Sequence, residues 1–516
     1  MYDVIVDAST PPAACSLGCA PWQDVSSAFN TANQSFINAL WLNSSVQAAA
    51  GSSCAMPANF QGQPEAHVGP ELSLTFDLSF GAQCYCAGSA SAPTSGFGYC
   101  RDPAVPTPQQ VNLMFGENEA ELSVSFVTVD GGHAIVSLPI VELCDGAVHC
   151  RNASGSSVRA STPQLPERIV TYHVVVLPSV TPGVDGYTYR VHPGVSGGVW
   201  SRTCNLRARP LSSEPTTIGI AGDLGIYPFN CFTNVLADKS LTFFLHLGDH
   251  AYNMAMGGGA RGDAYMIGWE PILSNIPWIP VYGNHELEGS PFGAYCPKEE
   301  YCQGRYLNQT RALARLGAAS GSNSTLYFSI DIGLAHIVVL DYMEYIGLDH
   351  EAAEQLKWLN FDLEAAAAPA HRARVPWIIV AGHVPMYSSG GDSSGLIKDI
   401  EPLLFKYAVD LHVVGHDHFY QSNWPTGPNG HVGLKNFIKP TAPVHVVTGA
   451  GGAPAFSGER QPGIANPTEK ALPDYVRTLI HRWSWSKAIA YNQSVLVWQQ
   501  IDNINGTILD EWVIVK

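Results

Sequence analysis

The sequence has few charged residues, and few of those are basic. Charged residues make up 14% of the 516 positions, and 27 Lys and Arg stand against 44 Asp and Glu, which gives a formal net charge of -17. Nucleic acids and anionic membrane surfaces are bound by clustered Lys and Arg. The composition therefore argues against both partners. An anionic substrate would need a local source of positive charge.

Long hydrophobic runs are also missing. No stretch approaches the roughly 20 apolar residues that a membrane-spanning helix needs, so we expect no membrane span. The first residues contain neither a basic start nor the apolar stretch of a signal peptide, and we therefore expect this sequence to be a mature or trimmed form.

Cysteine is absent from the last 214 residues, although the chain contains twelve. An even number of clustered cysteines favours disulfides over scattered core thiols. The pairing does not follow from the sequence, but short separations favour Cys144 with Cys150 and Cys296 with Cys302. Seven N-x-[ST] sequons accompany the cysteines, at Asn33, Asn43, Asn152, Asn308, Asn323, Asn492 and Asn505. Together they predict a secreted glycoprotein with N-linked glycans, extracellular or in a vacuolar or lysosomal lumen.

The length and the changing sequence pattern predict three segments. A chain of 516 residues is too long for one ordinary core. Residues 1–105 contain half of the cysteines and form a Cys-rich extension without recognisable chemistry. Residues 106–210 show alternating and β-branched strands, which predict a small all-β sandwich. Residues 211–516 follow a different pattern and form the third segment.

The third segment contains short, wholly apolar runs separated by longer stretches. Such runs are typical of buried parallel strands, and with a helix over 351–368 that Pro369 should end, they predict an α/β layer. The runs lie at 218–221, 243–247, 278–281, 336–340, 377–381 and 411–414. Strand patterns return near residue 444, and those at 494–501 and 508–515 are expected to add edge strands to the same core.

Five of the apolar runs end in a glycine followed by polar side chains that can bind metal ions. The blocks are Gly222-Asp223, Gly248-Asp249-His-Ala-Tyr252, Gly283-Asn284-His285-Glu286, Gly382-His383 and Gly415-His416-Asp-His418. Glycine permits a sharp turn, and ligands of open α/β sheets bind just beyond the carboxyl ends of strands. Each block alone is better explained as a turn or a core histidine. Five at successive strand ends predict one shared site.

The residue types suit a centre with two metal ions. A carboxylate can bridge two cations, imidazoles bind first-row metals, and amide or phenol oxygens fill harder positions. Two metal ions about 4 Å apart can clamp a phosphoryl group and activate water. They would also supply the positive charge that the composition lacks.

The five blocks resemble those of purple acid phosphatases, which are calcineurin-like metallophosphoesterases, and a tyrosine three residues after the second aspartate marks that subgroup. Further similarity covers 106 to the end of the chain, so that the first hundred residues lie outside it. Residues 108–111 and 124–128 resemble the start of the family's fibronectin-III-like domain. The implied fold is an α/β catalytic domain, a layered β-sheet sandwich flanked by helices, after that domain and the Cys-rich extension.

The resemblance also implies the role of each site residue. Asp223, Tyr252 and His418 would hold Fe(III), Asn284, His383 and His416 would hold a divalent ion (Fe, Zn or Mn), and Asp249 would bridge the two. His285 would contact the phosphate or protonate the leaving group, with Asn284 also at the substrate. A purely hydrogen-bonding role for His285 is the alternative.

The implied activity is that of an acid phosphatase, which hydrolyses small phosphate monoesters by attack of a metal-bound hydroxide, without a phosphoenzyme. A phosphodiesterase of the same superfamily and a catalytically weak secreted or wall glycoprotein that retains the scaffold are the alternatives. One departure bears on substrate binding, because residues 386–399 contain no histidine where many family members have one. We expect Ser388, Ser389, Ser393 and Ser394 to offer hydroxyl groups there, and Asp392 to face solvent or cap a turn.

Overall fold

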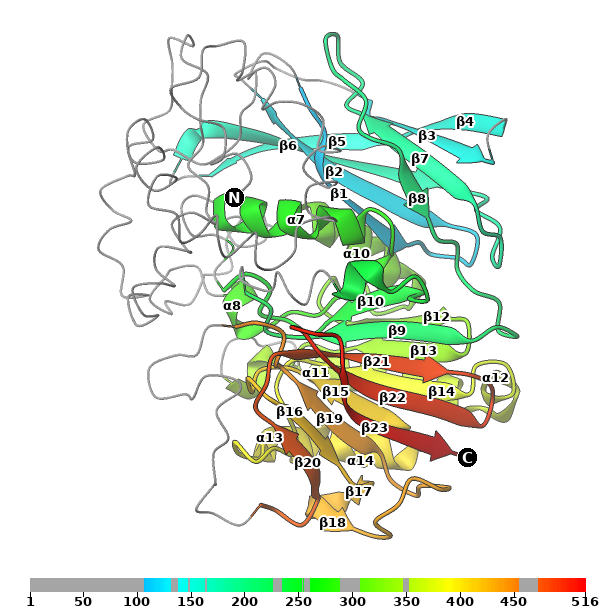
Figure 1. The fold of residues 1–516 in the computed structure, drawn as a ribbon, viewed down its shortest axis with the longest axis vertical. Helices are drawn as coiled ribbons and strands as arrows, with labels where there is room; N and C mark the ends of the chain where they lie inside the picture. Colours follow the sequence, from blue (N-terminus) through cyan, green and yellow to red (C-terminus); the bar gives the residue numbers. More distant parts are fainter. Residues whose placement is uncertain are drawn as a thin grey trace.

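The computed structural model in Figure 1 describes most of the chain after residue 105. The described residues are 106–130, 138–146, 149–162, 165–225, 234–252, 254, 260–287, 307–346, 352–453 and 472–516. The predicted Cys-rich extension over 1–105 and the predicted pair Cys296 and Cys302 lie outside these ranges.

The first described segment forms two four-stranded antiparallel sheets, at the top of Figure 1. In the order β1-β2-β6-β5, the first sheet contains β1 (Gln109–Phe115), β2 (Leu122–Asp130), β6 (Leu165–Leu177) and β5 (Ser156–Thr162). In the order β4-β3-β7-β8, the second contains β4 (His149–Ser154), β3 (Ile140–Asp145), β7 (Tyr187–His192) and β8 (Cys204–Leu206). Alternate residues of β7, from Tyr187 to Val191, are buried together with Val111 and Val124 of the first sheet. The alternation predicted for this all-β segment therefore corresponds to a core that both sheets share.

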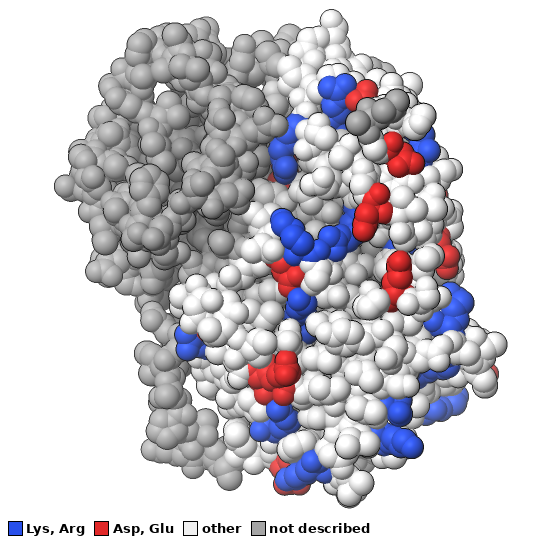
Figure 2. Space-filling view, turned by 45° about the vertical axis from the view of Figure 1, so that its right-hand side comes forward, with Lys and Arg blue, Asp and Glu red and all other residues white. Residues whose placement is uncertain are grey.

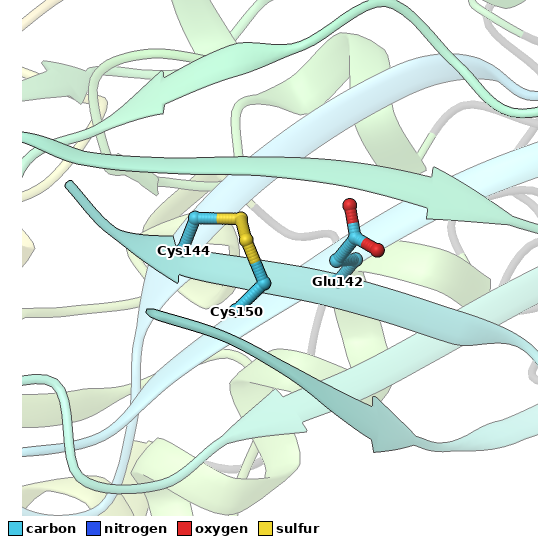
Figure 3. Close-up of side chains that lie close together, drawn as sticks. All are labelled: Glu142, Cys144 and Cys150. Atoms are coloured by element: carbon cyan, nitrogen blue, oxygen red, sulfur yellow. A yellow bond between two sulfur atoms is a disulfide. The ribbon is translucent and has the colours of Figure 1, made fainter. Parts of the chain in front are cut away.

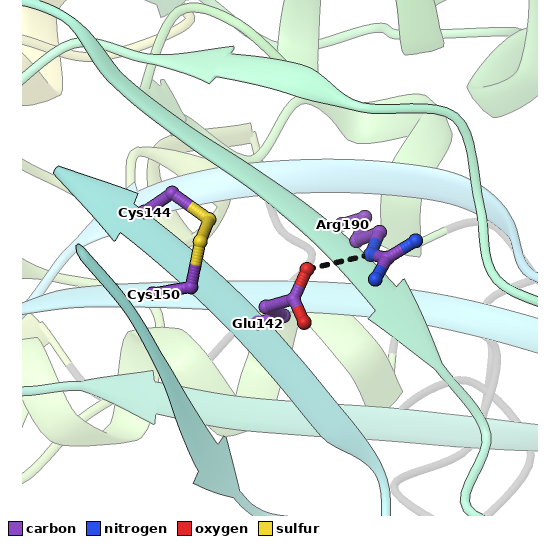
Figure 4. Close-up of a disulfide and its surroundings, with 4 residues drawn as sticks. All are labelled: Glu142, Cys144, Cys150 and Arg190. Carbon is purple, nitrogen blue, oxygen red and sulfur yellow. Dashed lines mark hydrogen bonds and ion pairs between the residues drawn. A yellow bond between two sulfur atoms is a disulfide. The ribbon is translucent and has the colours of Figure 1, made fainter. Parts of the chain in front are cut away.

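A disulfide joins neighbouring strands of the second sheet (Figure 3). Cys144 of β3 lies directly opposite Cys150 of β4, and the bond confirms the pairing that the short separation favoured. Glu142 lies beside it and accepts a 2.7 Å hydrogen bond from Nε of Arg190 on β7 (Figure 4). The disulfide and this ion pair link three adjacent strands.

Two larger sheets lie in the described part of the chain after residue 210. The six-stranded sheet has the order β11 (Trp278–Pro280), β10 (Phe243–His246), β9 (Thr216–Ala221), β21 (Ser484–Ala490), β22 (Val495–Asp502) and β23 (Ile508–Val515). The seven-stranded sheet has the order β12 (Phe328–Ile332), β13 (Ala335–Val339), β14 (Trp377–Ala381), β15 (Leu411–Val414), β19 (Val444–Thr448), β16 (Tyr420–Asn423) and β20 (Val476–Ile480). β17 (Thr426–Gly427) pairs with β18 (His431–Val432). As predicted, β22 and β23 extend the sheet of the same core, with β23 as its edge strand and β22 next to it.

Burial on both faces explains the wholly apolar strands. In β14, Trp377, Ile379 and Ala381 pack into the cluster that the six-stranded sheet shares, whereas Ile378 and Val380 pack into a second cluster. Leu359, Leu363, Leu396 and Leu404 of the covering helices belong to that second cluster. Because successive side chains of a strand point to opposite faces, only an unbroken apolar run suits such a position.

The helices of the described residues lie along the chain between these strands. They are α7 (Ala260–Leu273), α8 (Asn284–Leu287), α10 (Leu307–Ala319), α11 (Ala352–Ala367), α12 (Pro369–Arg372), α13 (Ser394–Asp399) and α14 (Glu401–Lys406), with 3-10 turns η5 (Met343–Ile346) and η6 (Pro428–Gly430). The predicted helix over 351–368 matches α11. Pro369 does more than end it, because it begins α12, where its missing N–H costs nothing.

Helix α7 lies between the N-terminal sheets and β10 (Figure 1). Trp269 packs against Phe244 of β10, and Glu270 accepts a 2.6 Å hydrogen bond from the backbone of Gln110. This helix therefore links the two parts of the molecule. No helix among the described residues has the length and apolar character needed to cross a membrane.

Candidate active site

The five glycine-containing blocks follow five strands, as the sequence predicts. Their strands nevertheless belong to two sheets, and not to one: β9, β10 and β11 of the six-stranded sheet, and β14 and β15 of the seven-stranded sheet. Within each sheet these strands are parallel, so their carboxyl ends lie at one edge. The N–H of His416 donates a 2.7 Å hydrogen bond to Asp223 Oδ2, which ties the two edges together.

The glycines serve mainly to let the blocks approach each other. Of the five that begin a block, only Gly248 has positive φ, at 85°. A Cβ on Gly415 would lie 2.5 Å from the carboxylate of Asp223, and one on Gly283 would overlap the carboxylate of Asp249. Any larger residue would therefore push the buried carboxylates apart. The sharp turn expected from the sequence explains Gly248 alone.

One group of side chains consists of Asp223, Tyr252 and His418. The Tyr252 hydroxyl lies 3.0 Å from Asp223 Oδ1 and 2.6 Å from His418 Nε2, and the latter nitrogen lies 3.5 Å from the same carboxylate oxygen. Asp223 and Tyr252 are buried. Three blocks thus bring a carboxylate, a phenol and an imidazole to one point.

A second group consists of Asn284, His383 and His416. The amide oxygen of Asn284 lies 3.2 Å from His383 Nε2 and 3.2 Å from His416 Nδ1, and these two nitrogens are 3.3 Å apart. The other nitrogen of His383 lies 2.7 Å from the carbonyl oxygen of Leu247, which leaves Nε2 to face the group.

Asp249 lies beside this second group and orients the backbone of His285. Its Oδ2 is 3.4 Å from His383 Nε2, while Oδ1 accepts a 2.9 Å hydrogen bond from the backbone N–H of His285. The His285 ring packs at 4.5 Å, centroid to centroid, from the ring of Tyr252, and its side chain is 17% exposed. His285 is therefore held at the surface of the site, against a member of the first group.

The donor atoms are arranged as a cation would require. Around a tetrahedral ion with bonds of about 2.0 Å, neighbouring ligand atoms lie about 3.3 Å apart. The distances within the second group are 3.2 and 3.3 Å. Lone pairs that face one another so closely repel unless a proton or a cation lies between them. The second group therefore fits a metal ion as it stands, whereas the 2.6 Å contact between Tyr252 and His418 in the first group is a hydrogen bond that an ion would have to replace.

Burial and charge set the protonation of these residues. Burial alone would lower the pKa of His383, but the carboxylates of Asp249 and Asp223 outweigh it and raise that pKa to about 10. Burial raises the pKa of Tyr252 well above its ordinary value, and Asp223 and Asp249 add to the effect. The pKa of Asp249 is lowered, because His383 and His285 outweigh its burial. The site is rich in buried negative charge, which suits cations.

Four site residues have backbone conformations that side chains seldom adopt. Asp223, Asp249, Tyr252 and His416 have φ between 50° and 70°. Such conformations cost of order 1–3 kcal/mol each and gather at functional sites. The packing around the strand ends keeps these four residues in place.

Glu286 has a role that the sequence did not reveal. Its buried carboxylate accepts backbone hydrogen bonds from Asp249 (2.7 Å), His250 (2.9 Å) and Gly283 (2.9 Å), and lies 3.1 Å from the His250 ring. It therefore fixes the second block against the third. The sequence shows that Glu286 belongs to the third block. It does not show these bonds, because His250 and Asp249 lie 36 and 37 positions earlier in the chain.

The histidine-free segment after His383 is bound to the last block. The Ser388 hydroxyl donates to Asp417, and the Ser389 N–H donates to Gln421 at 2.9 Å. Ser393 is the N-cap of α13. The Ser388 hydroxyl is therefore already bonded, contrary to the expectation that it is offered to substrate, whereas the Ser393 oxygen only accepts a bond from the Leu396 N–H. Asp392 is exposed and accepts hydrogen bonds from Ser388 N and the Tyr475 hydroxyl, which confirms its predicted turn-capping position.

Comparison with known proteins places the chain in a family. The calcineurin-like phosphoesterase model matches residues 216–420, and the model for iron/zinc purple acid phosphatase-like protein C matches residues 442–511. The two matches together cover more than half of the chain. The chain belongs to the purple acid phosphatases.

Individual relatives agree with this membership. Human acid phosphatase type 7 is 29% identical over 403 residues, 72% of this chain and 83% of the relative. Purple acid phosphatase 18 of Arabidopsis thaliana is 30% identical over 250 residues, 47% of this chain and 51% of the relative. A purple acid phosphatase from yellow lupin seeds has the same fold, with a TM-score of 0.62 and 21% identity over 80% of this chain and 74% of that one. The α/β metallophosphoesterase fold is thereby confirmed.

Proposed function

We propose that the protein is an acid phosphatase that hydrolyses phosphate monoesters at a centre with two metal ions. The observation that carries the proposal is the pair of donor groups around Asp249, one with Asp223, Tyr252 and His418, and one with Asn284, His383 and His416. Family membership supports the reaction class.

In this proposal Asp223, Tyr252 and His418 would hold Fe(III), Asn284, His383 and His416 would hold a divalent ion (Fe, Zn or Mn), and Asp249 would serve both ions. When bound, two such ions polarise the phosphoryl group, lower the pKa of water and stabilise the leaving oxygen. The residues of the chain orient these ions. The hydrogen bond from His383 to Leu247 and the carboxylate of Glu286 keep the ligands in position.

His285 is the proposed acid. Its imidazole is partly exposed, and Asp249 and Tyr252 hold the residue at the edge of the donor groups. From this position it can bind a phosphate oxygen or donate a proton to the leaving alkoxide. The amide of Asn284, its neighbour in the chain, is the second proposed contact to substrate.

Comparison of two substrates tests the reaction. Purified protein should release the aryl alcohol from p-nitrophenyl phosphate at acidic pH far faster than from bis(p-nitrophenyl) phosphate. The reverse preference would identify a phosphodiesterase. Metal-loaded protein without turnover of either ester would identify a non-catalytic scaffold.

We also propose that the protein is secreted or enters a vacuolar or lysosomal lumen with N-linked glycans. Asn152, Asn323, Asn492 and Asn505 belong to sequons, and all four are exposed. The disulfide between Cys144 and Cys150 fits an oxidising compartment. On the face drawn in Figure 2, basic and acidic side chains are intermixed.

The proposed organisation keeps three units: a Cys-rich extension over 1–105, a fibronectin-III-like domain over 106–210 and a catalytic domain over 211–516. The two small antiparallel sheets support an all-β second unit. Limited proteolysis with mass spectrometry would test the boundaries, and we expect cuts near residues 105 and 210, between the proposed units.

A further inference from the structure

A second cluster of metal-binding side chains lies on the helix side of the seven-stranded sheet. It consists of Asp331 on β12, His336 on β13 and His371 on α12, whose donor atoms all lie within 4.8 Å of one another. His336 Nδ1 is 2.7 Å from Asp331 Oδ1, and His371 Nε2 is 2.9 Å from Asp331 Oδ2. Two imidazoles thus face one carboxylate.

This cluster is separate from the proposed active site. His336 is paired with Ile378 near the start of β14, whereas His383 follows the far end of that strand. Five residues of extended chain span about 16 Å. The two sites share no residue.

The nitrogens that point away from the cluster are already bonded. His336 Nε2 lies 3.0 Å from Asp362 Oδ2 on α11, and His371 Nδ1 lies 3.1 Å from the carbonyl oxygen of Ala366. Histidines that bind metals generally donate the outer N–H to a carboxylate or a backbone carbonyl, which fixes the ring and leaves the inner nitrogen as the ligand. Both histidines of the cluster are held in this way.

From this arrangement we propose that Asp331, His336 and His371 bind a divalent zinc-like ion. Two imidazoles and one carboxylate are a common three-ligand set for Zn²⁺, and solvent can supply the fourth ligand, because Asp331 and His371 are 24% and 20% exposed. The ion would join the β12–β13 hairpin to α12 at a distance from the catalytic residues. Its expected role is structural.

Protons compete with the ion for the inner nitrogens of His336 and His371, which face the Asp331 carboxylate. Burial lowers the pKa of His336, but its hydrogen bonds to Asp331 and Asp362 outweigh burial and raise the pKa to about 9. The 2.7 and 2.9 Å separations also suit hydrogen bonds, and ligands of a tetrahedral ion would move about 0.5 Å apart. Arg374, half exposed, lies 3.1 Å from Asp331 Oδ2 and adds an opposing charge. Raising the pH and removing Arg374 should therefore favour the ion, because both reduce the positive charge that competes with it.

Metal analysis after equilibrium dialysis against Zn²⁺ at pH 7.5 tests the proposal. Wild-type protein should hold one zinc ion per chain more than His371→Gln, a substitution at a partly exposed position that the fold should tolerate. His431→Gln, at an exposed histidine outside both clusters, should match wild type. Because all three proteins share the catalytic residues, the difference does not depend on the proposed function.

Two further measurements complete the test. Added Zn²⁺ should raise the midpoint of thermal unfolding more in wild type than in His371→Gln, and Arg374→Gln should bind the extra ion about threefold tighter, since one nearby positive charge is removed. Turnover should be the same in all of these variants. Equal zinc content and equal zinc-induced shifts in wild type and His371→Gln would overturn the proposal and identify the cluster as an ion pair only.

Discussion

The hydroxyl of Tyr252 lies 2.6 Å from Nε2 of His418, although 166 residues separate them in the chain. Tyr252 follows β10 of one sheet, and His418 follows β15 of the other. Their approach shows that the site forms only when both sheets are packed together. Side chains that hold metal ions here would therefore also stabilise the contact between the sheets.

The position of Tyr252 beside His418, in the proposed iron-binding group, predicts that the iron-loaded protein is coloured. A tyrosinate bound to Fe(III) absorbs visible light, so the iron-loaded protein should be pink or purple. Tyr252→Phe should lose this absorption before it loses its fold. The control is Tyr407→Phe, whose hydroxyl bonds Asn360 on a distant helix and whose loss should leave the spectrum intact. An active but colourless, iron-free wild-type protein would contradict the Fe(III) assignment.

Asp249 and Asp223 should differ in importance. Asp249 is the proposed bridge and also accepts the N–H of His285, whereas Asp223 is assigned to one ion. Asp249→Asn should therefore lose roughly tenfold more turnover than Asp223→Asn. The measurement is kcat on an aryl phosphate, with metal content determined in the same samples. Equal losses with both metals retained would count against the bridge.

His285 should contribute more to turnover than the serines of the segment after His383. A general acid contributes on the order of 100-fold or more, so kcat of His285→Ala should fall by that amount. Ser393→Ala should stay within about threefold and instead lose about 0.5 kcal/mol of stability, because Ser393 caps α13. Kinetics on one aryl phosphate and thermal unfolding separate the two effects. A large loss of kcat in Ser393→Ala together with a near-normal kcat in His285→Ala would contradict the assignment of His285 as the general acid.

Glu286 should act by positioning. Replacing its carboxylate by an amide weakens its bonds to the backbone of Asp249, His250 and Gly283. Partners of metal ligands typically matter by 10- to 100-fold, and we expect kcat and metal affinity of Glu286→Gln to fall by about that amount. Glu354→Gln, at an exposed glutamate on α11, is the control. Unchanged metal affinity in Glu286→Gln would show that the carboxylate has no such role.

His173 should reduce stability at acidic pH. Burial lowers its pKa from 6.5 to about 4, and its ring nitrogens bond the hydroxyls of Thr128 and Ser157. Between pH 6.5 and about pH 4, His173 binds more protons in the unfolded state than in the folded state. The free energy of unfolding therefore falls as the pH falls. At pH 5 the cost is about 2 kcal/mol relative to pH 7.5.

Urea unfolding of His173→Gln at both pH values measures this effect. The free energy of unfolding of the variant should change less between pH 7.5 and pH 5 than that of wild type, by about 2 kcal/mol. His431→Gln, at an exposed histidine, should keep the wild-type pH dependence. An identical pH dependence in His173→Gln would show that this histidine does not titrate as the structure indicates.

The sequence predicted the strands that are buried on both faces more closely than the exposed ones. β14 was located to the residue because every position is apolar, and so was β15, in which His412 is the one position that is not apolar. β4, with the sequence HCRNAS, has no apolar alternation and could not be recognised. Helix α7 contains Gly262, Gly268 and Pro271, which conceal its helical pattern.

The sequence predicted which residues lie together at the strand ends better than it predicted how they are held there. Each block keeps its glycine and polar residues within a few positions, so local sequence shows them. The division between two sheets and the hydrogen bonds of Glu286 depend on distant partners. The same holds for Asp331, His336 and His371, because His336 lies in an otherwise apolar strand and its partners come from other elements.

Turnover measured as a function of metal content tests the central claim most directly. Purified wild-type protein should be depleted of metal with a chelator, then reloaded with iron and a divalent ion, with p-nitrophenyl phosphate hydrolysis at acidic pH followed at each stage. Hydrolysis should disappear with the metals and return when both are restored. Full activity in metal-depleted protein, or no activity in fully loaded protein, would contradict a phosphatase with two metal ions.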